Sequence, residues 1–337
     1  MQPKLIIHGG AGSSLKDGRA AVAHDLHEIV TAVYRKLQGG ATATAAVIYG
    51  CQLLEANPRF NAGKGSVLQS DAQVRMSASL MEGASQRFSG VINVSRVEHP
   101  IDLAAFLQTC DDRVLSDYGA ADLAREMRLP IYDPLTDLRI QEWMAERVDN
   151  FQKSMAGVVA ETVQADETGQ ADGTDQADGT DQVDGTNQID GKDQAARRGT
   201  IGVVALDYNG QIAAGTSTGG KGLERIGRVS DSAMPAGNYA TPEAGVSCTG
   251  IGEDIIDESL AAKIVIRVVD GMTLTQAVDK SIDEAARNQR DLGAIAIDKT
   301  GAIAWGKTSE VLLAAYHDGT QIGDSLAAST SPQSATI

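Results

Sequence analysis

The sequence predicts a mixed α and β fold in which layers of helix and sheet pack on each other. Two predicted β-hairpins flank a pair of predicted helices in the C-terminal part, and the first half alternates short apolar runs with helical patterns. A chain of 337 residues, 42% hydrophobic and 22% charged, is long enough to bury a substantial core. Aromatic residues are scarce at 4%, and 36 glycines favour close packing of small residues.

The predicted elements of the first half are a strand, two helices and a hairpin. The run KLIIHGG, residues 4–10, is typical of a strand ending in a glycine turn. Apolar residues recur at amphipathic-helix spacing over residues 18–37, before a glycine pair, and a second helix is predicted over residues 42–55. Residues 63–83 are expected to form a hairpin with its turn at Ser70-Asp71.

The C-terminal part has the clearest local signals. Residues 200–218 read as two strands around an Asn-Gly turn, which is a strong hairpin signal, and residues 293–306 repeat the pattern. The spacing of apolar residues predicts helices over residues 253–269 and 274–288.

The middle of the chain differs in kind. Residues 170–193 are a hexapeptide, QADGTD, repeated four times with small changes. The repeat has almost no apolar residue to bury, so the conformational entropy lost on ordering it would not be offset by burial. It is therefore predicted to be a disordered linker. It lacks the distal bidentate Glu of an EF-hand, which argues against a calcium site. We therefore divide the chain into residues 1–164, an acidic linker over residues 165–199, and residues 200–337.

Charge and composition exclude several classes of protein. The net charge of −16 argues against binding to nucleic acid or to an anionic membrane, although half of it lies between residues 165 and 196. The N-terminal apolar run is too short for a signal peptide, and no apolar stretch approaches 18 residues. The three cysteines are widely spaced, without a CxxC pair, which favours a reducing compartment. We expect a cytoplasmic protein.

Two catalytic motifs match the sequence but not its context. GTSTG, residues 215–219, fits G-x-S-x-G and would make Ser217 the nucleophile of a serine α/β-hydrolase, with His317 downstream as its base. A nucleophile elbow must lead into a helix, whereas here TGGKGLERIG follows. GAIAWGKT, residues 301–308, fits the phosphate-loop pattern, but its central residues are apolar and belong to a predicted strand.

Thr200 begins a strand directly after the linker and Gly199. A threonine hydroxyl is a weak nucleophile unless a base removes its proton, and one solution is the α-amine of the same threonine. An α-amine has a reference pKa of about 7.7 to 8, so a useful fraction is unprotonated near neutrality. This chemistry requires cleavage of the bond between Gly199 and Thr200. The alternative is that Thr200 is a β-favouring residue at the start of a strand.

Several long motifs, in this order, carry a resemblance to a known family: IIHGGAG, RFNAGKGSV, GTIGVVALDYNGQIAAGTSTGG, GRVSDSAMPAGNYA and VSCTGIGE. Together they resemble the plant-type L-asparaginases, which are also isoaspartyl peptidases, of the N-terminal nucleophile hydrolase class. The resemblance covers the chain apart from the acidic insert. It implies an α+β fold, a four-layer αββα sandwich, in which autocatalytic cleavage before Thr200 yields two chains that assemble as a dimer of αβ units.

The resemblance also implies roles for individual residues. Thr200 is expected to be the nucleophile and Thr218 to support its hydroxyl, while Thr249 and Gly250 match the positions that polarise the scissile carbonyl and hold the oxyanion. The substrate would be bound through its α-carboxylate and ammonium groups by Arg228, Asp231, Gly252 and Asn61.

No cofactor is expected for catalysis. A structural sodium ion is implied in a loop whose backbone carbonyls come from Leu54, Glu55, Asn57, Phe60, Ala62 and Lys64. The predicted substrates are L-asparagine and β-aspartyl dipeptides, which would release L-aspartate through a covalent acyl-enzyme. Two alternatives stay open: the Ser217/His317 hydrolase, and a binding protein without enzymatic activity that displays the acidic repeat.

Overall fold

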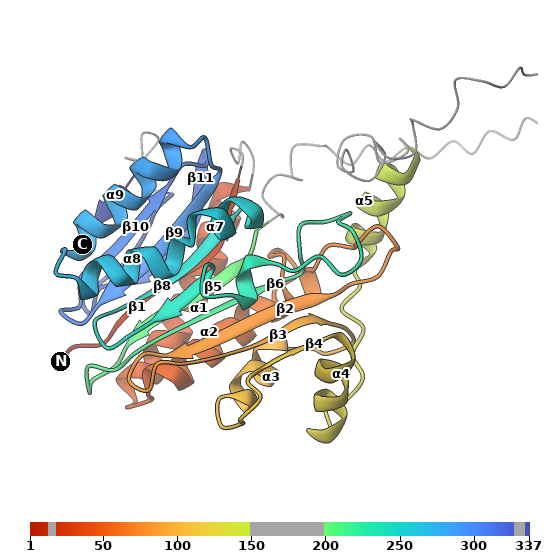
Figure 1. Ribbon diagram of the computed structural model, residues 1–337, viewed down its shortest axis with the longest axis horizontal. Coiled ribbons are helices and arrows are strands. Elements are labelled where there is room, and N and C mark those ends of the chain that lie inside the picture. The colour runs from red at the N-terminus through yellow and green to blue at the C-terminus, as the bar shows by residue number, and fades with distance from the viewer. Residues whose placement is uncertain (13–17, 149–198, 327–333) are drawn as a thin grey trace, which may run out of the picture.

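The computed structural model describes residues 1–12, 18–148, 199–326 and 334–337 (Figure 1). Apart from Gly199, the predicted linker over residues 165–199 lies outside these described residues, as does the hexapeptide repeat. Among the described residues, no helix is both long enough and apolar enough to cross a membrane.

The elements before residue 149 provide four strands and most of one helical layer. In chain order they are β1 (Lys4–Gly12), α1 (Arg19–Gln38), α2 (Ala43–Ala56), the 3-10 helix η1 (Gly63–Gly65), β2 (Met76–Glu82), β3 (Arg87–Val94), α3 (Pro100–Leu107), β4 (Val114–Ser116), α4 (Asp117–Glu126) and α5 (Asp137–Val148).

The elements after residue 198 complete both sheets. They are β5 (Ile201–Leu206), β6 (Ile212–Thr218), the 3-10 helix η3 (Asp231–Ala233), β7 (Asn238–Ala240), β8 (Ala244–Gly250), α7 (Gly252–Glu258), α8 (Leu260–Val269), α9 (Leu274–Arg287), β9 (Leu292–Asp298), β10 (Ile303–Lys307), β11 (Val311–His317), β12 (Ile322–Asp324) and β13 (Ser334–Thr336).

The strands form two sheets in the part of the chain that the structure describes. The larger sheet has eight strands in the order β12-β11-β1-β5-β6-β2-β3-β4, and the smaller has five in the order β13-β10-β9-β8-β7. The strand pairs are antiparallel except β3 with β4. β1 lies between β11 and β5, so the two ends of the chain meet within one sheet.

The two sheets face each other, and helices cover their outer faces (Figure 1). Helices α1, α2 and α3 pack on the larger sheet, while α8 and α9 pack on the smaller one. Strands β1, β5 and β6 of the larger sheet contact β8 or β9 of the smaller. The fold is therefore the four-layer αββα sandwich that the resemblance implied.

Alternating side chains along the central strands supply two different cores. In β5, Val203 packs into the core beneath α1 to α3, and the next residue, Val204, packs between the sheets. This two-residue period is the geometry of an extended strand buried on both faces, and it explains why β5 is apolar throughout. A third core lies between the smaller sheet and helices α8 and α9.

Most local predictions are confirmed, and two are wrong. The hairpins at residues 200–218 and 293–306 form, and residues 303–307 are strand β10, as expected for a chance phosphate-loop match. Residues 63–83 do not form a hairpin, because the backbone around their turn bonds to the loop at residues 223–224 instead. The helix predicted over residues 253–269 is broken into α7 and α8.

Candidate active site

Thr200 lies at the start of a central strand of the larger sheet. β5 pairs with β6 so that Ile201 faces Ser217, and this register brings Thr200 next to Thr218. The Thr200 hydroxyl donates a hydrogen bond to Thr218 Oγ1 over 3.2 Å, and the backbone N–H of Gly220 donates to the same oxygen over 3.1 Å. Both threonines are buried. The hydroxyl of Thr200 is therefore held in one orientation in a space with little water.

The residue before Thr200 is packed backbone to backbone. A Cβ atom added to Gly199 would lie 2.3 Å from the Cα atom of Gly10, and one added to Gly10 would lie 2.7 Å from the Cα atom of Gly199. Gly10 has φ 135° within a bulge of β1, a conformation that other residues rarely adopt. Gly10 of IIHGGAG thus makes room for the peptide that precedes Thr200. From the sequence, this run was expected only to be a strand ending in a glycine turn and one of the motifs that carry the resemblance.

Thr249 and Gly250 end strand β8, across the space between the sheets. Thr249 is fully buried, and its hydroxyl has no hydrogen-bond partner. A buried hydroxyl left unpaired costs about 1 to 3 kcal/mol, so a partner supplied by a substrate would be favourable. Gly250 has φ 129°, and a Cβ atom there would lie 2.6 Å from the Asp291 carbonyl oxygen, which leaves glycine as the residue that fits.

Arg228, Asp231 and Gly252 form a charged corner beside β8. A Cβ atom on Gly252 would lie 2.5 Å from Arg228 Nη2 and 2.8 Å from Asp231 Oδ1, so these three residues are in close contact. In this structure Arg228 makes a two-pronged ion pair with Glu253, at 2.9 and 3.1 Å. Glu253 was not predicted from the sequence; its place directly after Gly252, which the resemblance puts beside Arg228 in the substrate site, could have indicated it.

Asp231 is an unusual carboxyl group. It is buried, and its Oδ2 atom has no hydrogen-bond partner. Burial raises its pKa from 3.8 to about 7, against the opposing effect of Arg228 and of the Ser230 hydroxyl. An unpartnered buried carboxylate is a natural site for a positive ligand group, because an ammonium ion would offset the desolvation.

Asn61 lies behind Thr218 and bonds entirely to backbone atoms. Its side chain donates to the carbonyl oxygen of Gly220 over 2.7 Å and accepts from Val67 N–H over 3.0 Å, while its own carbonyl accepts from Gly219 N–H. These bonds tie the loop after α2 to the turn after β6. Asn61 is thus positioned to hold the Thr218 turn in place.

A second polar group lies between the sheets near Thr200. His8 Nε2 is 2.8 Å from Ser247 Oγ, which is 2.7 Å from Thr216 Oγ1. Burial lowers the pKa of His8 to about 3, opposed by a contact with the Thr200 backbone, so His8 is neutral. The sequence gives no local sign of this group, because its three residues come together only through the stacking of the two sheets.

The loop implied to hold sodium is compact. A Cβ atom on Gly63 would lie 2.4 Å from the carbonyl oxygen of Glu55, and one on Gly65 would lie 1.9 Å from that of Phe60. Main-chain oxygens are suitable ligands for a hard cation, and the crowding of carbonyls around glycines fits such a site. The carbonyls of Leu54, Asn57 and Ala62 also accept backbone hydrogen bonds within the loop. No group of three or more His, Cys, Asp or Glu side chains that could hold a metal ion occurs among the described residues.

The Ser217/His317 alternative is contradicted by the geometry. Ser217 Oγ donates to the buried carboxyl group of Glu55 over 2.6 Å. His317 lies on β11, which is separated from β6 by β1 and β5, and its ring stacks on Tyr34. The two side chains therefore cannot form a nucleophile and base pair.

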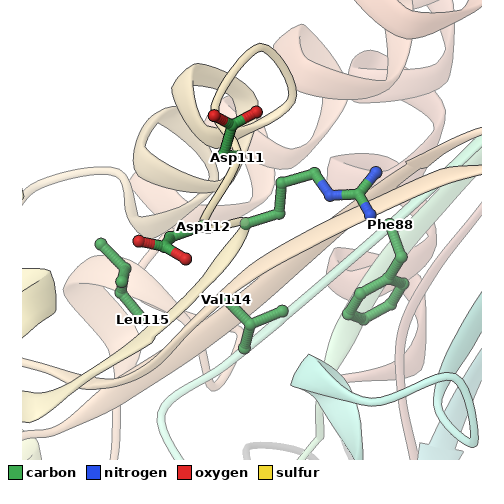
Figure 2. A pocket seen from close by; sticks show the side chains of 6 residues that line it. Phe88, Asp111, Asp112, Val114 and Leu115 are labelled. Atoms are coloured by element: carbon green, nitrogen blue, oxygen red, sulfur yellow. The ribbon is translucent and has the colours of Figure 1, made fainter.

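A hollow at the edge of the larger sheet lies apart from these residues. It is lined by Phe88 and residues 111–115, and Figure 2 shows Val114 between Leu115 and Phe88. Its volume is about 520 Å³. Strands β2 and β3 separate β4, which lines it, from β6. This hollow brings together none of the residues predicted to bind substrate.

Comparison with known proteins agrees with this geometry. The family described as Asparaginase matches residues 1–327. The chain belongs to the asparaginase family. An isoaspartyl peptidase/L-asparaginase of Synechocystis sp. is 64% identical over 328 residues, 97% of this chain and 91% of that protein. One from Nostoc sp. is 60% identical, over 100% of this chain and 98% of that protein.

More distant members of the asparaginase family also align along nearly the whole chain. A plant-type L-asparaginase of Pyrococcus horikoshii is 33% identical, with 93% of this chain and 95% of that protein covered. The asparaginase relatives therefore span both parts of the chain, before and after Thr200.

Proposed function

We propose that the chain is a self-processing threonine amidohydrolase that cuts itself between Gly199 and Thr200 and then hydrolyses L-asparagine and β-aspartyl dipeptides. The observation that carries the proposal is the buried hydrogen bond from Thr200 Oγ1 to Thr218 Oγ1 at the junction with Gly199. The substrate class follows the relatives named isoaspartyl peptidase/L-asparaginase.

Processing would convert Thr200 from an internal residue into an active one. Its hydroxyl oxygen attacks the Gly199 carbonyl, the C–N bond breaks, and the proton moves to the departing nitrogen, which becomes the free α-amine. Water then hydrolyses the resulting ester and leaves Gly199 with a carboxylate. The freed amine can act as the base for the hydroxyl of the same residue.

In turnover, Thr200 Oγ1 would attack the side-chain carbonyl of the substrate. Its proton passes to the α-amine, and the hydroxyl of Thr249 with the Gly250 backbone would stabilise the oxyanion that forms. Collapse of this intermediate breaks the C–N bond, and the leaving ammonia or amino acid takes the proton from the α-ammonium. Water hydrolyses the ester and releases L-aspartate. No step needs a cofactor.

Recognition of the amino-acid end is proposed for the charged corner. Arg228 would exchange Glu253 for the substrate α-carboxylate, which matches its planar fork. Asp231 and the Gly252 backbone would receive the substrate ammonium, and Asn61 would keep the Thr218 turn in place behind them. We propose that sodium, held by the backbone carbonyls of the loop after α2, shapes that loop without taking part in the chemistry.

We also propose that two cleaved units associate as a dimer of αβ units. The support is the resemblance to the plant-type asparaginases. Size-exclusion chromatography with light scattering measures this directly: the expected mass is twice that of one cleaved unit, and a mass of one unit would contradict it.

A denaturing gel and an activity assay test the proposed function. The purified wild-type chain is expected to run as two fragments with Thr200 at the N-terminus of the second, and to release aspartate from L-asparagine and from β-Asp-Leu. The Thr200→Ala variant should stay intact and inactive. A single intact chain that hydrolyses esters would favour a serine hydrolase, and an intact inactive wild-type chain would favour a binding protein; either result contradicts the proposal.

A further inference from the structure

Glu55 is a buried acid whose side chain is hydrogen-bonded to β6 one residue before Thr218. It projects from the last turn of α2 and is fully buried. Its Oε1 atom accepts from Ser217 Oγ over 2.6 Å and from Ile101 N–H over 3.2 Å, and its Oε2 atom is 3.2 Å from His99 Nδ1. One carboxyl group thus joins α2, β6 and the first turn of α3.

Ser217, the partner of Glu55 on β6, adjoins Thr218 along its own strand and the start of β5 across the pairing. Ser217 precedes Thr218, which accepts the hydrogen bond from Thr200, and it faces Ile201, which follows Thr200. Successive residues of a strand point to opposite faces, so Ser217 lies toward the helical layer while Thr218 lies toward the space between the sheets. The bond from Ser217 to Glu55 therefore fixes the end of β6 from behind.

Burying a carboxyl group costs desolvation free energy, and its hydrogen bonds must offset this cost, whereas a well-packed apolar side chain carries no such cost. An apolar residue could fill the space beneath β6, as Val47 and Cys51 do along the same face of α2. What an apolar residue could not do is fix a single position of Ser217 along the strand, since apolar contacts have no direction and hydrogen bonds do.

We propose that the Glu55 side chain is a positioning residue for the reaction: acting through Ser217, it holds the end of β6 so that Thr218 Oγ1 stays within reach of the Thr200 hydroxyl. This proposal rests on the function proposed above. It concerns the side chain of Glu55, whereas the resemblance concerned only its backbone carbonyl.

The test compares two buried serines of the same sheet. Ser217→Ala removes the bond to Glu55. The matched control is Ser89→Ala on β3, because Ser89 is also fully buried and its hydroxyl also joins the sheet to α3, by donating to the Ala104 carbonyl over 2.5 Å. Self-cleavage, melting temperature, kcat and KM for L-asparagine are measured for each purified variant.

A positioning role and a merely structural role give different results. We expect Ser217→Ala to lower kcat about tenfold and to slow self-cleavage, with KM within about twofold of wild type, because Thr218 is not expected to bind the substrate. Ser89→Ala should lower the melting temperature by a similar amount and leave kcat unchanged. An unchanged kcat in Ser217→Ala, or equal losses of kcat in both variants, overturns the proposal.

A double-mutant cycle gives a second, independent result. Glu55→Gln keeps the shape of the side chain. Because the proposal has Glu55 act through Ser217, the double variant Glu55→Gln/Ser217→Ala should lose no more kcat than the worse of the two single variants. If the kcat losses of the two single variants multiply in the double variant, the proposal is overturned. Failure of the proposed function is distinguishable, because then the wild-type chain itself neither cleaves nor hydrolyses L-asparagine.

Discussion

The buried carboxyl group of Asp231 suits a positive ligand group, but its ionised form lowers the stability of the folded protein. Its pKa is raised to about 7 in the folded protein by burial, from 3.8. Between about pH 4 and pH 7 the unfolded chain loses this proton while the folded chain keeps it. The contribution of Asp231 to the free energy of unfolding therefore falls as pH rises through this range and stays low above pH 7.

Replacing Asp231 by Asn should therefore stabilise the protein at high pH. In the Thr200→Ala background, which is expected to stay a single chain, Asp231→Asn should raise the free energy of unfolding by about 2 to 4 kcal/mol at pH 8 and by much less at pH 5. Urea unfolding at the two pH values measures this. An equal gain in the free energy of unfolding at both pH values would mean that ionisation of Asp231 is not its cause.

Asp207 provides the control for that substitution. It is as buried as Asp231, but it accepts hydrogen bonds from three backbone N–H groups, those of Ala43, Asn209 and Gln211. Asp207→Asn would turn an amide N–H₂ group toward one of these donors. We expect Asp207→Asn to lower the free energy of unfolding by about 1 to 3 kcal/mol at pH 8, the opposite sign from Asp231→Asn.

Gly252 is the residue whose missing side chain shapes the charged corner. A methyl group there would come within 2.5 Å of Arg228 Nη2 and 2.8 Å of Asp231 Oδ1. Gly252→Ala is expected to push these groups apart and to raise KM for L-asparagine about tenfold or more, as measured by steady-state kinetics. In the control Gly119→Ala, the new Cβ would be 3.8 Å from its nearest neighbour, so kinetics should not change. An unchanged KM in Gly252→Ala would exclude Gly252 from the binding site.

At the scale of elements, the break between α7 and α8 shows what apolar spacing misses. The spacing over residues 253–269 is helical throughout, yet Ser259 has φ 49° and ends α7 while it begins α8. Left-handed backbone costs a non-glycine residue about 1 kcal/mol. Ser259→Gly should therefore raise the melting temperature, whereas Ser259→Ala should not. A lower melting temperature in Ser259→Gly would contradict this explanation.

Elements with strong local signals could be predicted from the sequence. The Asn209-Gly210 turn fixes the β5–β6 hairpin, and Thr42 caps α2 within one residue of its predicted start. The expected hairpin over residues 63–83 failed for a nonlocal reason. Leu68 and Ser70 use backbone groups to bond with Leu223 and Glu224, and a short sequence window contains no sign of a partner so far along the chain.

At the scale of the whole molecule, the candidate site joins the two sheets. Thr200 and Thr218 come from the larger sheet, and Thr249 and Gly250 from the smaller. Their identities followed from a resemblance between motifs, because no local pattern brings them together. The contact between His8 and Ser247 could not be predicted, since it depends on the way one sheet packs on the other.

The topology also predicts how the protein would refold after the proposed cleavage before Thr200. In the larger sheet β1 comes from the part before Gly199 and lies between β11 and β5, which come from the part after it, while β2 pairs with β6. The two fragments are thus interleaved in one sheet, and neither can complete it alone. Cleavage should leave them associated in native buffer, because every strand pair survives the loss of one peptide bond.

Once denatured, however, the two fragments must find each other. Refolding of the cleaved wild-type enzyme from urea should become slower and less complete as protein concentration falls, whereas the Thr200→Ala chain, still joined, should depend on concentration much less. Fluorescence of Trp143 and Trp305, one in each fragment, follows both proteins in the same experiment. The same concentration dependence for both would show that the fragments fold independently, contrary to the sheet order. A larger effect in the cleaved enzyme follows from the interleaving itself, since closing the larger sheet requires a bimolecular step only when the bond before Thr200 is gone.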